Sequence, residues 1–74
     1  MDEQFRRAAY SERLGKWVAL YEENFTISNT GHFTCWSIRE YADVDAALEG
    51  LNYKVLACVY SEEPAWTCYE ALTD

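Results

Sequence analysis

The sequence predicts a small single α+β domain over residues 1–74, with an antiparallel sheet of four to five strands packed against helices. Three observations predict this class. The chain has 74 residues, which suits one domain near the lower size limit for independent folding. An aromatic and β-branched block occupies 17–39, and its first part, 16–22, alternates between two faces as half-buried strands do. Apolar residues at helical spacing follow at 44–51, before another strand-like segment.

Residues 2–14 are predicted to form an N-terminal amphipathic helix. Phe5, Ala8 and Ala9 share one side of this helix at helical spacing. Acidic residues stand in its first turn and a basic residue in its last turn, which suits the helix dipole. Gly15 is placed to end the helix, because glycine adopts the positive φ of a helix C-terminus without strain.

The next segment, at 17–30, is predicted to be extended, either as one bent strand or as two strands. Residues 28–32 are predicted to form a turn, because Asn29 and Gly31 both tolerate positive φ. Residues 33–39 then form the following strand.

A helix is predicted between the two groups of strands. Asp43 is its expected N-cap, and Gly50 or Asn52 ends it. Its apolar positions follow i, i+3, i+4, i+7 spacing, so we expect them to be buried against the sheet. These apolar positions are Val44, Ala47, Leu48 and Leu51.

The C-terminal part is predicted to be a hairpin. Residues 53–60 form the most strand-like segment of the chain. Residues 61–64, which include the only proline, are expected to turn, and residues 65–72 to form the final strand.

The negative charge of the chain is confined to one half. Residues 1–39 contain five basic and five acidic residues, whereas residues 40–74 contain one basic and eight acidic residues, which account for the whole net charge of −7. An acidic surface repels nucleic acid and anionic lipid and attracts basic protein surfaces. We therefore expect no direct binding to nucleic acid or membranes, and a protein partner whose basic surface itself binds nucleic acid.

A cytoplasmic location is expected. No apolar run approaches the ~18 residues of a membrane span. The first residues also lack the basic and then apolar layout of a signal peptide.

The three cysteines are predicted to be free thiols, because an odd number is unusual in a secreted disulfide scaffold. Cys58 and Cys68 are still able to face each other across the expected hairpin. No pair has the C-x₂₋₄-C spacing of a structural zinc site, so we assign no metal ligand. His32 is expected to be exposed in a turn, roughly 10 Å along the chain from Cys35.

No catalytic residue is assigned. The adjacent pairs Glu22–Glu23 and Glu62–Glu63 lie in predicted turns, where carboxylates are solvated. An acid–base pair needs one carboxyl group in an apolar pocket, and a domain of this size has little room for one. A glycine-rich phosphate loop is also missing from the sequence. We therefore expect neither enzyme activity nor a cofactor.

Aromatic residues are interleaved with carboxylates in residues 40–74. Tyr and Trp dominate the residues that contribute most to protein–protein affinity, so this mixture favours a binding surface. Solubility is the alternative explanation, because small domains often carry a net charge of this size. The predicted partner-binding residues are Glu40, Asp43, Asp45, Glu49, Glu62, Glu63, Tyr41, Tyr60 and Trp66.

In its small size, acidity, α+β pattern and lack of a catalytic motif, the chain resembles the small acidic inhibitors encoded by phages and plasmids. These include anti-CRISPR proteins and DNA mimics. The resemblance implies a protein that acts in the host cytoplasm without a cofactor. It would bind a host defence nucleoprotein, such as a CRISPR–Cas effector, and block the surface that takes nucleic acid or recruits a nuclease. Two alternatives are a small acidic interaction or antitoxin-like protein that neutralises a basic partner, and a small Cys/His enzyme or metal-binding protein.

Overall fold

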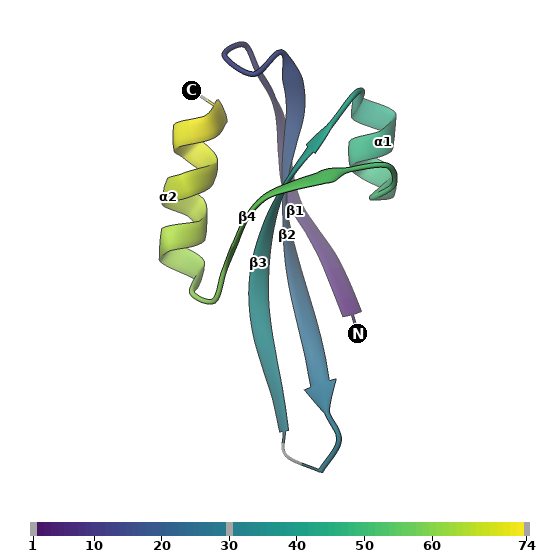
Figure 1. Cartoon of the computed structure of the whole chain (residues 1–74), viewed down its shortest axis with the longest axis vertical. Coiled ribbons are helices and arrows are strands. Elements are labelled where there is room, and N and C mark those ends of the chain that lie inside the picture. The colour runs from purple at the N-terminus through teal and green to yellow at the C-terminus, as the bar shows by residue number, and fades with distance from the viewer. Residues whose placement is uncertain (1, 30, 74) are drawn as a thin grey trace.

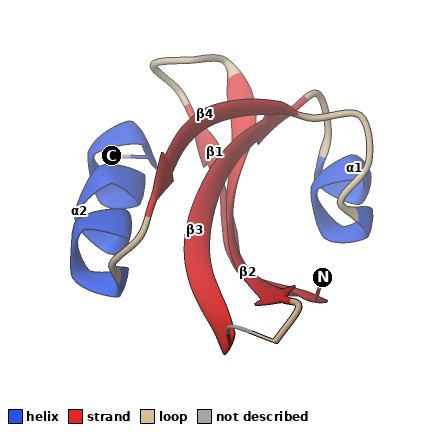
Figure 2. Cartoon of the chain, turned by 60° about the horizontal axis from the view of Figure 1, so that its bottom comes forward, coloured by secondary structure: helices blue, strands red, loops and turns tan. Residues whose placement is uncertain are grey.

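In the computed structural model, which describes residues 2–29 and 31–73, a four-stranded antiparallel sheet lies between two helices (Figure 1). The elements are β1 (Asp2–Ser11), β2 (Lys16–Ile27), β3 (Gly31–Tyr41), α1 (Val44–Glu49), β4 (Lys54–Val59) and α2 (Glu62–Thr73). Each strand pairs with the next one along the chain, so β1 and β4 are the two edges of the sheet. The helices cover opposite faces of the sheet, which gives three layers (Figure 2).

The N-terminal segment is a strand, so the predicted helix over residues 2–14 is wrong. Helix propensity is worth only tenths of a kcal/mol per residue, and pairing of β1 with β2 overrides it. A register shift between Phe5 and Arg7 interrupts the alternation that would have marked a strand in the sequence. Gly15 does adopt a positive φ, of 67°, but within the β1–β2 loop, where its N–H donates to the Ser11 carbonyl at 2.8 Å.

The central hairpin follows the alternating pattern of the sequence. β2 is one continuous strand, which decides between the two alternatives for residues 17–30. Asn29 and Gly31 have φ values of 65° and 111°, as predicted for the turn, while Thr30 lies outside the described residues. Phe25 and Phe33 stack on each other near this turn, with ring centroids 4.9 Å apart.

The C-terminal segment is a helix, so the predicted strand over residues 65–72 is wrong. Pro64 is the third residue of α2, where the backbone N–H has no partner within the helix, so proline is tolerated there. Two glutamates precede it in the first turn and favour the helix dipole. Ala65 and Tyr69 are buried one turn apart on the side that faces the sheet.

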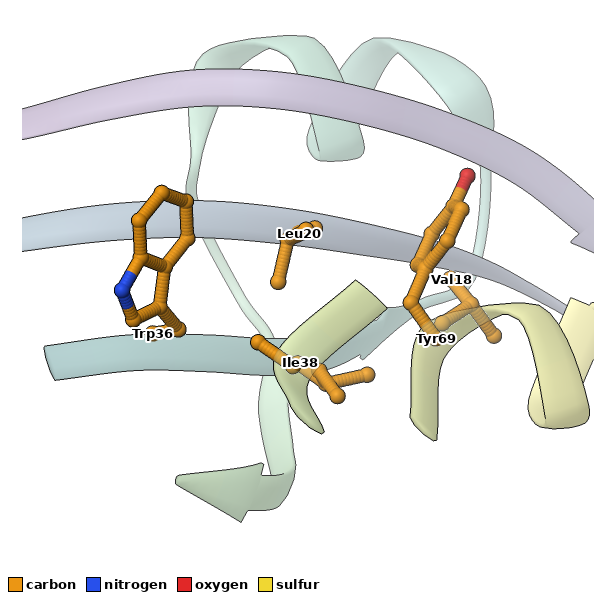
Figure 3. Packing of buried hydrophobic residues seen from close by; sticks show 6 residues of the cluster. Val18, Leu20, Trp36, Ile38 and Tyr69 are labelled. Carbon is orange, nitrogen blue, oxygen red and sulfur yellow. The ribbon is translucent and has the colours of Figure 1, made fainter. Parts of the chain in front are cut away.

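The core between the sheet and α2 takes alternate residues of the two central strands (Figure 3). Val18 and Leu20 of β2 belong to this core, and the ring of Tyr69 from α2 lies by Val18. Arg13, in the β1–β2 loop, donates to the Ala71 carbonyl near the end of α2, where a cation suits the helix dipole. The buried residues of this α2-side core are Val18, Leu20, Trp36, Ile38, Ala65 and Tyr69.

The ends of α1 agree with the prediction. The Asp43 carboxylate accepts a hydrogen bond from the Ala46 N–H at 2.8 Å, as an N-cap does. Gly50 ends the helix with a left-handed φ of 72°. The predicted strand at residues 53–60 is also confirmed, as β4.

The predicted burial of the apolar positions of α1 is wrong except at Ala47. The other three, Val44, Leu48 and Leu51, are exposed. The rings of Tyr21 and Tyr41 already fill this face of the sheet. The six-residue helix therefore packs against it through Ala46 and Ala47, while Leu48, and Leu51 after the helix, stay exposed. The buried residues of this α1-side core are Ala19, Tyr21, Tyr41 and Ala47.

Candidate protein-binding surface

The predicted acidic residues fall into groups on different sides of the molecule. Asp43, Asp45 and Glu49 belong to α1 and its cap, whereas Glu62 and Glu63 begin α2. The two helices lie on opposite faces of the sheet (Figure 2), so the structure does not bring these groups together on one surface.

The remaining predicted residues differ in exposure. Tyr41 is only 1% exposed, so its ring belongs to the α1-side core and is not presented to a partner. Tyr60, just after β4, is 72% exposed. Trp66 is half-buried in α2, and its indole N–H donates to the Glu62 carboxylate at 3.3 Å. Glu40 is half-buried on β3.

One surface combines exposed apolar side chains with carboxylates. Leu48 and Leu51 are 57% and 56% exposed. Asp45 and Glu49 are one helical turn apart and both exposed, so like charges stand together beside the leucines. We call this the α1 surface, and it consists of Asp43, Val44, Asp45, Leu48, Glu49 and Leu51. The sequence prediction included its carboxylates but placed its leucines in the core.

The α1 surface is held in place by contacts beneath the helix. The Tyr21 hydroxyl donates a 2.6 Å hydrogen bond to the Ala47 carbonyl. Gly50 lies so close to the same ring that a Cβ there would stand 3.2 Å from the Tyr21 hydroxyl oxygen. Because successive helical residues are turned by about 100°, burial of Ala47 directs Leu48 away from the sheet.

Arg39 is fully buried beneath this region and was not singled out from the sequence. Its guanidinium carbon lies 4.2 Å from the ring centroids of both Tyr21 and Tyr53. Its Nη2 donates to the carboxylates of Glu3 at 2.8 Å and Glu23 at 3.0 Å. Burial opposes the charge, but hydrogen bonds to these carboxylates and to a tyrosine hydroxyl outweigh it and raise the pKa of Arg39. Arg39 therefore stays positively charged, and the carboxylates of Glu3 and Glu23 balance its charge. These ion pairs link β3 to β1 and β2.

Glu22 and Glu23, one of the two adjacent carboxylate pairs, are held apart by the strand that carries them. Glu22 and Glu23 are consecutive in β2, so their side chains leave opposite faces of the sheet. Glu22 pairs with Arg6 at 3.2 Å, and Glu23 pairs with Arg39. Within residues 2–29 and 31–73 we find no pocket and no cluster of three or more His, Cys, Asp or Glu side chains suited to a metal ion.

The cysteines are free thiols, but they are not independent. The Sγ atoms of Cys35 and Cys58 are 3.2 Å apart across β3 and β4. Burial, together with the Cys58 thiol, raises the pKa of Cys35 to about 12. Cys68 packs into the α2-side core, so the contact between Cys58 and Cys68 considered from the sequence does not occur. His32 and Cys35 are three positions apart on β3, so their side chains leave opposite faces and do not form a nucleophilic pair.

Comparisons with known proteins found no relative of this chain. No family model, curated protein or solved structure matches it. In the part of the chain that the structure describes, neither helix is long and apolar enough to cross a membrane.

Proposed function

We propose that this protein is a non-enzymatic protein-binding module and that the α1 surface is its contact site. The observation that carries the proposal is the pair Leu48 and Leu51, each more than half exposed beside Asp45 and Glu49. Fully burying a leucine side chain is worth about 1.5–3 kcal/mol. Leu48 on α1 and Leu51 just after it therefore favour association with another apolar surface.

The partner surface carries apolar side chains flanked by lysine or arginine. Charge complementarity supports this choice, because α1 has an acidic residue in its first turn and no basic residue in its last turn. The chain also has a net charge of −7, and all of it comes from residues 40–74, the part that contains α1. Such a field speeds association with a basic surface and disfavours acidic competitors.

Binding of this kind makes the protein an inhibitor when the partner's basic residues normally hold phosphate. The partner then loses its contacts to nucleic acid, or to a nuclease, while the α1 surface covers them. A host defence nucleoprotein such as a CRISPR–Cas effector is the specific partner implied by the resemblance in size and charge. Neutralisation of a basic toxin would use the same surface, so the identity of the partner distinguishes the two functions.

The test is affinity capture from the native host with matched charge variants. The binding variant is Asp45→Lys with Glu49→Lys, and the control is Glu12→Lys with Glu70→Lys. All four side chains are exposed, and both variants change the net charge by the same amount. Captured proteins are identified by mass spectrometry, and the affinity of each variant for the purified partner is then measured in low and high salt.

We expect the α1 variant to weaken partner binding on the order of tenfold or more, and the control to bind like the unmodified protein. A variant with Leu48→Ser and Leu51→Ser should also weaken binding, and it keeps the charge unchanged. Added nucleic acid should compete with the protein for the partner. Equal effects of the two charge variants would show that the acidity acts through solubility alone.

A further inference from the structure

Cys35 and Cys58 form a pair of thiols on the sheet face that α1 partly covers. Their Sγ atoms are 3.2 Å apart, and Cys35 is buried whereas Cys58 is exposed. We propose that Cys58 is a thiol–disulfide exchange site for low-molecular-weight disulfides such as oxidised glutathione, and that Cys35 is the buried thiol that completes an intramolecular disulfide.

The positions of the two residues in the sheet support this pairing. Cys58 lies opposite Ser37 in the β3–β4 register, so Cys35 is its diagonal neighbour on the same face. A disulfide bond is about 2.05 Å long, so its formation requires the two sulfurs to approach by about 1 Å. Pairing with β3 holds Cys58 opposite Ser37, and pairing with β2 holds Cys35 opposite Glu23.

The difference in burial assigns the order of reaction. The exposed Cys58 is accessible to a dissolved disulfide, whereas a reagent has to enter the sheet to reach Cys35. The raised pKa of Cys35 further disfavours its thiolate, which is the reactive form. Cys35 therefore reacts second, and only with a sulfur already beside it.

The exchange balances as two successive displacements. The Cys58 thiolate attacks one sulfur of oxidised glutathione, the disulfide bond of glutathione breaks, and one glutathione leaves and takes a proton. Cys35 then loses its proton, attacks the Cys58 sulfur and releases the second glutathione. Two protein thiols are oxidised to one disulfide, and one oxidised glutathione is reduced to two glutathione thiols.

The disulfide would close the segment that contains α1. The chain from Cys35 to Cys58 includes most of β3, the whole of α1 and most of β4. Oxidation therefore fixes β4, an edge strand, to β3 and ties together both ends of the segment that presents the α1 surface. Cys68, in the α2-side core on the other face, takes no part.

The test exposes the folded protein to oxidised glutathione, blocks remaining thiols by alkylation, and measures the intact mass. The chain has no lysine or arginine after Lys54, so trypsin leaves Cys58 and Cys68 on one peptide. We therefore use Cys68→Ser, in which only Cys35 and Cys58 remain. If that variant does not fold, the unmodified protein is instead cleaved after Glu62 with a glutamate-specific protease, which separates Cys58 from Cys68.

We expect the Cys68→Ser protein to lose two hydrogens and to yield a peptide pair joined through Cys35 and Cys58. The thermal midpoint should rise on the order of 10 °C and return on reduction. Adding Cys35→Ser should leave a stable glutathione adduct on Cys58, and adding Cys58→Ser should leave Cys35 largely unmodified in the folded state.

Three results would overturn the proposal. One is a disulfide that contains Cys68 in the unmodified protein. Another is a glutathione adduct that persists on Cys58 while Cys35 is intact. The third is modification of Cys35 in the Cys58→Ser protein at the rate seen for Cys58.

Discussion

The hydroxyl of Tyr21 donates a 2.6 Å hydrogen bond to the carbonyl of Ala47, and this bond ties β2 to α1. Tyr69 is also buried, but its hydroxyl has no hydrogen-bond partner within the described residues. The buried hydroxyl of Tyr21 therefore keeps a hydrogen bond, whereas that of Tyr69, in the core on the opposite face, loses its contacts with water without gaining one.

We predict opposite outcomes for removal of these two hydroxyls. Tyr21→Phe leaves a backbone carbonyl without its donor and should lower the free energy of unfolding by about 1–3 kcal/mol. Tyr69→Phe removes a desolvated group and should be neutral or stabilising. Urea unfolding of both variants measures the difference. A loss of stability in Tyr69→Phe equal to that in Tyr21→Phe would contradict the assigned hydrogen bonding.

A second prediction concerns the close approach of Gly50 to Tyr21. Gly50→Ala imposes a left-handed φ on alanine and places a Cβ 3.2 Å from the Tyr21 hydroxyl oxygen. Gly15→Ala is the matched control, because its φ is 67° and a Cβ there meets nothing within 4 Å. We expect Gly15→Ala to lower the free energy of unfolding by about 1–2 kcal/mol and Gly50→Ala to lower it further. If both variants lose the same free energy of unfolding, the close contact between Gly50 and the Tyr21 hydroxyl is contradicted.

The third prediction separates the leucines of the core from those of the α1 surface. Leu20→Ala creates a cavity in the α2-side core and should lower the free energy of unfolding by about 2–5 kcal/mol. Leu48→Ala truncates an exposed side chain and should change it by about 0.5 kcal/mol or less. The helical spacing in the sequence predicts that Leu48 is buried and that Leu48→Ala loses about as much stability as a core variant. Urea unfolding of Leu20→Ala and Leu48→Ala therefore tests whether Leu48 lies outside the core.

A fourth prediction concerns alkaline pH. Burial raises the pKa of Tyr41 from 10.0 to about 12, so the folded protein keeps a proton that the unfolded chain has already released. This contribution to stability is complete below about pH 10 and is lost as the pH rises from about 10 to about 12. Unfolding measured across this range should show the fall, and Tyr41→Phe should make it shallower.

The features that the sequence predicts correctly depend on neighbouring residues. The cap at Asp43, the stop at Gly50 and the turn at Asn29 and Gly31 each require a particular backbone conformation or a short-range hydrogen bond. The alternation of β2 is likewise a local pattern, because this strand lies between two cores and fills both. Such features are encoded within a few residues.

The errors arose where distant residues decide the outcome. β1 has helix-forming residues and becomes a strand only because β2 pairs with it. In α2 the presence of Pro64 suggested a turn, although proline is compatible with the first turn of a helix. The ion pair of Glu3 with Arg39 and the contact of Cys35 with Cys58 depend on sheet register, which spacing along the chain does not specify.

The position of α2 after all four strands has a consequence for synthesis on the ribosome. The strands emerge in the order in which they pair, so the sheet is able to assemble by successive hairpins. Until α2 emerges, Val18, Leu20 and Ile38 form an uncovered apolar face on that sheet. A nascent chain stalled at this stage is a substrate for chaperones and for aggregation, and the 12 residues of α2 end that exposure.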